Sequence, residues 1–305
     1  MANYQKIIEL RPEVAEFIRF RRSIGYRGDV LAYGANISCD SFSTDASGFR
    51  HSMLGGKSFS VADCFQSERF GVVLGASNTF GFGVAGNEKC MASLLADRFG
   101  FPFANCAMPG ANSRNLHSLL LSLLARSTRR PVVVVHSSGG DLANFCESSV
   151  ADPVFGSPNR GQLRRATNGE TGVHPDPERS YPRLLAFTSL WTSAIAALCR
   201  VHKVGLILGH QTTFFEKTKP SGIELECGLG EPSNPRQERQ FANHRKFNEG
   251  FYRQRKLLAD RMDVPLPGWG LTDQLGFVDE FHCDADGIRA LSDASGEIID
   301  QLLAA

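Results

Sequence analysis

The chain has 305 residues, of which 42% are hydrophobic and 21% are charged, and its net charge is +1. This length and composition allow one large core, built either as a single domain or as a domain with an N-terminal extension. A net charge so close to zero argues against nucleic acid or an anionic membrane as the main partner. Residues 1–22 lack the apolar centre of a secretory signal, and we find no run long and apolar enough to span a bilayer, so we expect a cytoplasmic protein.

The eight cysteines are scattered along the chain without C-x-x-C spacing. In a cytoplasmic chain this pattern predicts mostly buried, reduced thiols and indicates neither a disulfide framework nor a zinc site. We therefore expect no metal and no other cofactor.

Residues 1–66 form the first predicted segment. They contain an amphipathic helix followed by a stretch rich in Gly, Ser and Asp, and we predict an N-terminal extension packed on the core. Residues 67–305 form the predicted main domain. It begins with residues 70–74, a short apolar run typical of a buried strand, and Ser77 lies in the turn beyond this strand.

Strand-like and helix-like segments alternate over the rest of the chain, which is the signature of a parallel sheet covered on both faces. We predict strands at 101–107, 131–135 and 204–208. We predict one helix at 88–99 with Asn87 as its cap and a second helix that begins after a cap at Ser113. Further helices are predicted at 183–200, 236–261 and 285–303. The sum predicts an α/β fold, a three-layer αβα sandwich with a flavodoxin-like parallel sheet. Residues 142–181 and 211–235 interrupt the alternation as long loops, which either wall the substrate site or are surface insertions.

Two short motifs at opposite ends of the chain supply groups for catalysis. Residues 75–78 read G-A-S-N after the first strand of the main domain, and residues 279–282 read D-E-F-H near the C-terminus. A serine nucleophile needs a neutral imidazole within hydrogen-bond reach and a carboxylate that orients this imidazole. Asp279 and His282 are one turn apart, so one short loop can hold both. The two motifs predict a triad of Ser77, His282 and Asp279.

In their order along the chain, these motifs resemble those of the SGNH hydrolases, also called the GDSL family, whose blocks supply Ser, Gly, Asn and His. Residues 75–81 read G-A-S-N-T-F-G, similar to the family's G-D-S-x-T-x-G with Ala76 in place of the aspartate. Gly110 ends N-C-A-M-P-G and matches the glycine block, and the D-x-x-H block is intact at Asp279 and His282. The resemblance covers the chain from about residue 70 to the C-terminus and implies the SGNH fold and a serine esterase or acyltransferase.

The third block departs from the family pattern. Its G-x-N-D would fall on S-G-G-D after the valine run, where Gly140 stands in place of the asparagine. Losing one oxyanion donor costs about 100- to 1000-fold in turnover, so either another donor replaces it or the activity is weak. Asn78, Asn112 and Asn144 are candidates nearby in sequence, and Asn144 is favoured because it lies one helical turn past Asp141.

The resemblance also implies roles for the residues around the nucleophile. The backbone N–H groups of Ser77 and Gly110 would bind the oxyanion, with Asn144 as a further donor. Asp141 can instead hold its loop together, and His210 can be a structural or wall residue because no carboxylate lies near it in sequence. The residues that we expect around the substrate are Asn78, Asn112, Gly140, Asp141 and His210.

Residues 81–86 match G-x-G-x-x-G, a pattern found in dinucleotide-binding sites. Such glycines open a helix directly after a strand and are paired with an acidic residue at the end of the second strand. Here the match begins six residues past Gly75, and the second predicted strand ends near Asn105 without an acid. The motif is therefore weak evidence for a nucleotide.

We expect a serine-dependent ester hydrolase or acyltransferase that forms an acyl-enzyme on Ser77. The resemblance favours a small acyl ester, above all an acetyl ester, of a carbohydrate or related metabolite. The alternative is a non-catalytic protein of the same fold that binds a carbohydrate or a partner. The sequence leaves the substrate and the oligomeric state open.

Overall fold

The computed structural model describes residues 4–27, 30–137, 140–148, 151, 176–210, 212–268 and 270–304. Its central element is a four-stranded parallel sheet in the order β6-β5-β7-β8. The strands are β5 (Gly71–Leu74), β6 (Phe103–Asn105), β7 (Val133–Ser137) and β8 (Gly205–Gly209). Counted along the chain, this order is 2-1-3-4, the first four positions of the flavodoxin-like arrangement. The predicted fold class is confirmed.

An irregular segment extends the sheet beyond β8. Leu208 N donates to Pro265 O at 2.9 Å, and His210 N donates to Pro267 O at 3.2 Å. A proline has no N–H, so these two residues accept hydrogen bonds from β8 but cannot donate in return. The segment therefore lies where a fifth strand would stand without completing a ladder, and the sequence pattern gave no sign of it.

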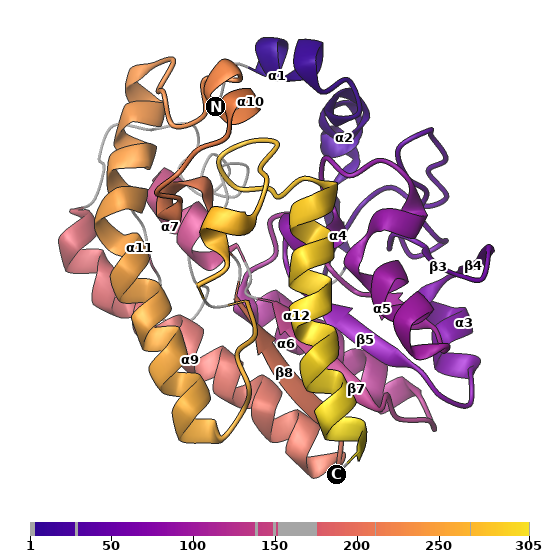
Figure 1. Ribbon diagram of the computed structural model, residues 1–305. Helices are drawn as coiled ribbons and strands as arrows, with labels where there is room; N and C mark the ends of the chain where they lie inside the picture. Colours follow the sequence, from indigo (N-terminus) through magenta and orange to yellow (C-terminus); the bar gives the residue numbers. More distant parts are fainter. Residues whose placement is uncertain are drawn as a thin grey trace.

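Helices cover both faces of the sheet, as Figure 1 shows for α12 in front of the strands. On one face lie α5 (Met91–Phe99) and α12 (Ala285–Ala304), and on the other lie α6 (Ser113–Arg126) and α9 (Pro177–Val201). Strand residues alternate between the two cores: Val73 and Val135 face the first pair of helices, and Val72 and Val134 face the second. Burial on both sides explains the nearly uninterrupted apolar strands.

Two further helices lie outside these layers. The long helix α11 (Pro235–Met262) packs against α9 and against the short helix α7 (Asp141–Ser148). A separate apolar cluster, which includes Phe145, Leu184 and Phe251, joins the three helices. This cluster fixes α7, whose first turn lies at the carboxyl end of β7.

Helix α9 is long and apolar enough, by length and composition, to cross a membrane. The expectation that no run meets this criterion is therefore wrong, because residues 184–199 carry no charged side chain. In the fold, Leu184, Phe187 and Ile195 are buried, and the helix contacts β8, α6 and α11. Its apolar character serves to cover one face of the sheet.

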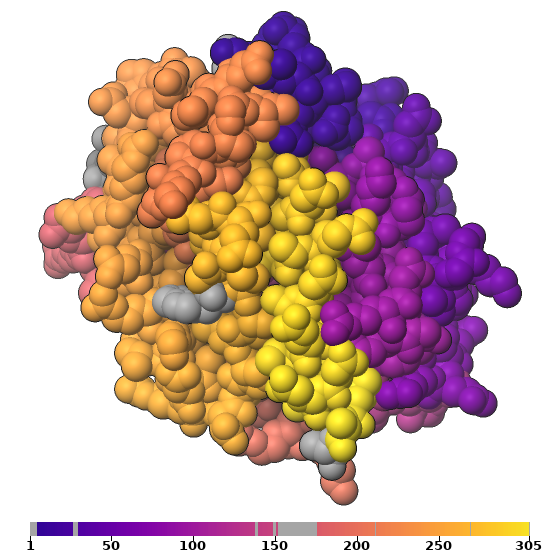
Figure 2. All heavy atoms as spheres, viewed as in Figure 1, coloured from indigo at the N-terminus to yellow at the C-terminus, as the bar shows by residue number. Residues whose placement is uncertain are grey.

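The N-terminal residues form part of the same core. They fold into α1 (Tyr4–Leu10), α2 (Val14–Phe20), the 3-10 turn η1 (Arg21–Ser23), the hairpins β1 (Gly25–Arg27) with β2 (Val30–Ala32) and β3 (Ser52–Leu54) with β4 (Lys57–Phe59), and α3 (Val61–Gln66). Ile7, Phe17 and Phe42 are buried in one cluster with Val73 of β5. Figure 2 shows these residues as one continuous surface with the rest of the chain.

Several predicted boundaries shift in the structure. The predicted N-terminal helix is two helices, and Asn87 begins the 3-10 turn η2 (Asn87–Lys89) instead of capping α5. Asn112, rather than Ser113, caps α6 through a reciprocal capping box with Asn115. A helix cap is the residue whose side chain accepts from the first free N–H groups, and at α6 this residue lies one position before the predicted cap.

The two predicted loops are partly helical. Helix α7 occupies the start of the 142–181 segment and α9 begins at Pro177, while residues 149–150 and 152–175 lie outside the described part of the chain. The 211–235 segment contains η3 (Phe214–Glu216) and α10 (Gly222–Glu226), and a further turn, η4 (Thr272–Gln274), follows α11.

All eight cysteines are described, and all are free thiols. Seven are buried and Cys39 is half-buried, which confirms the prediction that the cysteines are mostly buried.

Candidate active site

Ser77 is the first residue of the short helix α4 (Ser77–Phe80), which follows directly after β5. The turn between strand and helix is tight: a Cβ on Gly75 would lie 2.2 Å from Thr79 Oγ1. Only glycine fits this position, so the chain can reverse within two residues and place the half-buried Ser77 at the carboxyl end of the sheet. This is the edge where open α/β sheets build their sites.

A continuous chain of hydrogen bonds joins the three residues predicted as a triad. Ser77 Oγ lies 2.7 Å from His282 Nε2, and His282 Nδ1 lies 2.7 and 2.8 Å from the two carboxylate oxygens of Asp279. Because a carboxylate can only accept, Nδ1 carries the proton and Nε2 is left to accept the hydroxyl proton of Ser77. The three side chains therefore form one continuous hydrogen-bonded chain.

Asp279 is held as a carboxylate although it is only 1% exposed. Burial raises its pKa, but the electrostatic interaction with His282, the hydrogen bond from this residue and the backbone N–H groups of Phe281 and His282 together outweigh burial, so the pKa is lowered from its usual value. The two backbone bonds measure 2.8 and 3.0 Å. An ionised Asp279 both orients the imidazole and stabilises an imidazolium.

Asn78, which the sequence predicts as a substrate contact, is bonded to the residue after His282. Its Oδ1 accepts from Cys283 N at 2.9 Å, and its Nδ2 lies 3.6 Å from Cys283 Sγ. The side chain is 2% exposed. Asn78 directly follows Ser77, and Cys283 directly follows His282. The bonds between Asn78 and Cys283 therefore hold the two catalytic candidates close together.

Backbone hydrogen bonds connect the loops that follow β5, β6 and β7. Met108 N donates to Gly75 O at 2.8 Å, and Gly140 N donates to Ala111 O at 2.6 Å. The loop after β6 thus lies between the other two. Gly110, which has a φ of +79° and is half-buried, is on this middle loop.

Asn144 occupies the space beside Gly140. A Cβ on Gly140 would lie 3.5 Å from Asn144 Nδ2, and this amide nitrogen is 3.4 Å from Gly110 O. A longer side chain at position 140 would extend into the volume that the Asn144 amide fills. The structure therefore brings a side-chain amide to the loop of Gly110 from one helical turn further along the chain.

Two other predicted substrate contacts, Asp141 and Asn112, have partners inside the fold. Asp141 is fully buried, and its carboxylate accepts from Ser113 N at 3.2 Å and from Ser113 Oγ at 2.7 Å. Burial raises the pKa of Asp141, against the lowering effect of these hydrogen bonds. Asn112 accepts from Asn115 N in the capping box of α6. Asp141 thus joins the first turns of α6 and α7, while Asn112 caps α6.

His210 follows β8 and has a carboxylate partner, contrary to the sequence expectation. Its Nε2 lies 3.0 Å from Glu216 Oε2, and its ring packs edge-on against Tyr252 with centroids 4.3 Å apart. Glu216 is six residues away, beyond the turn η3, so the pairing was not visible in the sequence. The buried His210 joins the 212–216 segment to the sheet.

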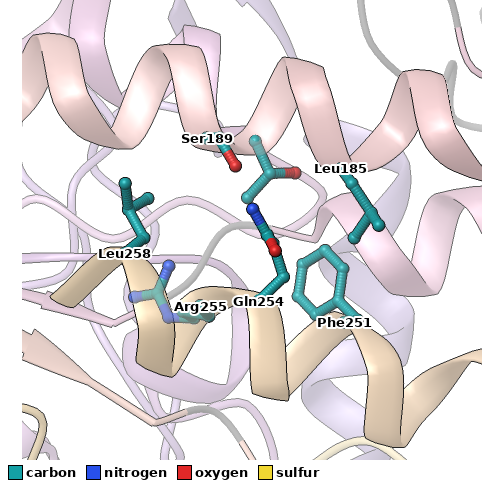
Figure 3. Close-up of a pocket in the computed structure, with 7 residues that line it drawn as sticks. Leu185, Ser189, Phe251, Gln254, Arg255 and Leu258 are labelled. Carbon is teal, nitrogen blue, oxygen red and sulfur yellow. The ribbon is translucent and has the colours of Figure 1, made fainter. Parts of the chain in front are cut away.

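A small pocket lies between α9 and α11, and its lining contains no triad residue (Figure 3). Arg255 lines it and is 2% exposed. Its Nη2 donates to the carbonyls of His136 and Gly209, each at 3.1 Å. Arg255 thus ties together the ends of β7 and β8. In the part of the chain that the structure describes, no cluster of three or more His, Cys, Asp or Glu side chains could hold a metal.

Glu280 connects the triad loop to the 212–235 segment. Its Oε1 accepts from Gly230 N at 3.3 Å, and its backbone carbonyl accepts from Phe214 N at 3.0 Å. The side chain is 2% exposed. Burial, and next the negative charge of Asp279, raise the pKa of Glu280 to about 7.

This raised pKa predicts a pH-dependent stability that Glu280→Gln removes. Glu280 binds a proton more tightly in the folded state than in the unfolded state. Protonated Glu280 therefore adds to the free energy of unfolding in full below the unfolded pKa of 4.5, and this addition is lost as pH rises through about 7. Across this window, the wild-type free energy of unfolding should fall by roughly 3 kcal/mol more than that of the variant. Urea unfolding at pH 5, 6, 7 and 8 measures the difference. Parallel pH profiles for the two proteins would contradict the prediction.

Fold and site together define a class: an αβα sandwich in which Ser, His and Asp side chains form one hydrogen-bonded chain at the carboxyl edge of the parallel sheet. No protein-family model and no curated protein matches the chain. Among solved structures, it is similar to a carbohydrate acetylesterase family member from Sinorhizobium meliloti, with 14% identity, 78% of this chain and 100% of that chain covered, and a TM-score of 0.49.

Two other solved structures have comparable similarity. One is TesA, with 16% identity, coverage of 77% of this chain and 99% of that one, and a TM-score of 0.45. The other is a lipolytic protein of the G-D-S-L family from Desulfitobacterium hafniense DCB-2, with 11% identity, coverage of 76% and 99%, and a TM-score of 0.44.

Proposed function

We propose that the protein is a serine esterase or O-acyltransferase of the SGNH type. The observation that carries the proposal is the unbroken hydrogen-bond chain from Ser77 Oγ through His282 to Asp279, with both links at 2.7 Å. A serine hydroxyl that donates to a neutral, carboxylate-oriented imidazole is arranged to lose its proton during attack on a carbonyl.

The proposed reaction has two halves. Ser77 Oγ attacks the ester carbonyl carbon while its proton passes to His282 Nε2, and a tetrahedral oxyanion forms. The bond from carbon to the leaving alcohol then breaks, and His282 returns the proton to that alcohol. Water or an acceptor alcohol resolves the acyl-enzyme by the same steps in reverse order, so hydrolysis and transfer use the same groups.

Three donors are proposed to stabilise the oxyanion: the backbone N–H groups of Ser77 and Gly110, and Nδ2 of Asn144. The placement of the Asn144 amide beside Gly140 and Gly110 supports its role, because an asparagine at position 140 would project toward the same space. Preorganised donors of this kind contribute most where charge develops in the transition state.

The proposed substrate is a small acyl ester, with acetyl favoured, of a carbohydrate or related metabolite. The family resemblance of the sequence motifs supports this class of substrate. The net charge of +1 gives no reason to expect a strongly charged polymer as the acyl carrier.

Fluorophosphonate labelling tests the proposal directly, because the probe modifies only an activated serine. Purified protein should incorporate one equivalent of probe, and peptide mapping should place it on Ser77. Ser77→Ala, shown to be folded by circular dichroism, should not be labelled. Folded wild-type protein that takes up no probe would refute the proposal and favour the non-catalytic carbohydrate- or partner-binding alternative.

A further inference from the structure

The G-x-G-x-x-G segment is the loop that follows the nucleophile helix. Gly81, Gly83 and Gly86 have φ values of +85°, +81° and +89°, in the region that only glycine adopts easily. A Cβ on Gly83 would lie 2.7 Å from Val278 Cγ2, next to Asp279. The three glycines therefore allow the backbone conformation of this loop and its close packing against the segment that carries Asp279.

Arg50 lies at the centre of this loop. The side chain is 1% exposed and comes from the N-terminal region, ahead of β3. Its guanidinium has five N–H donors in a rigid plane. They are directed at the carbonyls of Ser41, Phe80, Gly81, Val84 and Gly86, at 2.8 to 3.3 Å, and at Asn87 Oδ1 at 3.1 Å.

Phe82 projects from the same loop onto the triad. Its ring stacks on the imidazole of His282, with centroids 4.3 Å apart and planes inclined by 30°. On another side, Phe82 packs against Phe17 of α2 at 5.3 Å. The phenyl ring is 4% exposed, so it is fixed between the N-terminal region and the catalytic base.

We propose that Phe82 is a positioning residue for His282 and that Arg50 holds Phe82 in place by organising the loop between Phe80 and Asn87. Through Arg50, the N-terminal region then contributes to the placement of the base, although Arg50 does not touch the reacting atoms. This inference rests on the proposed function, because it concerns the base that activates Ser77. Hydrogen bonds to Ser77 and Asp279 fix the position of the two ring nitrogens, and the stacked ring restrains rotation of the imidazole out of that plane.

The test uses Phe82→Leu with Phe42→Leu as a matched control. Phe42 is a buried phenylalanine of the same aromatic cluster and contacts Phe17, Tyr33 and Phe80, but not His282. A fluorophosphonate probe should label Phe82→Leu about 10-fold or more slowly than wild type, because a displaced base costs this much or more. Phe42→Leu should lose stability yet label within about 2-fold of wild type.

Proton NMR of histidine-labelled protein gives a readout that loss of stability alone would not produce. Deleting the Phe82 ring shifts the resonance of the nearby His282 Nδ1 proton through the lost ring current alone, so the diagnostic variants are those that keep this ring. In Phe42→Leu the resonance should stay in place. Arg50→Lys, which offers three donors in place of five, should shift the same resonance if it folds. An unchanged labelling rate in Phe82→Leu, or an unchanged resonance in folded Arg50→Lys, would overturn the inference. Failure of the wild type to label would overturn the proposed function itself.

Discussion

Replacing His282 by alanine should lower kcat for 4-nitrophenyl acetate by about 10⁶-fold, the size of effect seen when a triad histidine is removed from a serine hydrolase. Among the described residues, His282 Nε2 is the basic side-chain atom that hydrogen-bonds to Ser77 Oγ. Without His282, the hydroxyl has no acceptor for its proton during attack. Steady-state rates, together with fluorophosphonate labelling of Ser77, measure the loss.

Asp279→Asn should be less severe, at about 10⁴-fold in kcat. The amide can keep its oxygen toward the backbone N–H groups of Phe281 and His282, which now bind the carboxylate. Its NH₂ group would then face Nδ1 and favour the wrong imidazole tautomer. The two variants should thus rank in order, His282→Ala below Asp279→Asn. Equal activity of either variant and wild type, in protein shown to be folded, would exclude the triad mechanism.

The parts of the site that the sequence revealed are the ones with local patterns. Asp279 and His282 are three residues apart, so one loop brings them together whatever the rest of the fold does. Ser77 follows an apolar strand, and parallel strands present their carboxyl ends at one edge. Ser77 and His282 are 205 positions apart in the sequence, and only the family resemblance of the two motifs predicted that they meet.

Other features depended on partners that no local pattern identifies. Arg50 reads as an ordinary charged residue, and its role is visible only when the loop after Ser77 is folded around it. His210 and Glu216 are separated by a turn whose path was unknown. The segment at Pro265 has the wrong residues for a strand, because proline removes the donor that a ladder needs. Each of these contacts is set by tertiary packing rather than by the period of the sequence.

Asn144→Ala should lower kcat by about 100- to 1000-fold and leave KM nearly unchanged. Removing an oxyanion donor has this effect because the donor binds the transition state more tightly than the ground state. The measurement is steady-state kinetics with 4-nitrophenyl acetate. Asn243→Ala is the matched control. Asn243 Nδ2 donates to Cys146 O of α7 at 3.2 Å, so this substitution removes a similar amide contact with the helix that carries Asn144. The control should keep kcat within about 3-fold of wild type.

A second substitution can distinguish loss of a donor from loss of structure. Gly140 has no positive φ, and a Cβ there would meet Ala111 O at 3.4 Å and Asn144 Nδ2 at 3.5 Å, both ordinary contacts. Position 140 therefore tolerates a side chain, provided that the Asn144 amide is absent. Adding Gly140→Asn to Asn144→Ala should recover at least about 10-fold in kcat, because the amide returns from the neighbouring position.

Gly140→Asn alone should lose activity, because two amides would compete for one space beside Gly110. This sign reversal, harmful alone and restorative in the Asn144→Ala background, is the outcome that a purely structural role of Asn144 does not produce. If the double variant is no more active than Asn144→Ala, the amide of Asn144 is not the missing donor. The oxyanion would then be held by the backbone N–H groups of Ser77 and Gly110 alone, and the exchange of asparagine for Gly140 would be a loss without replacement.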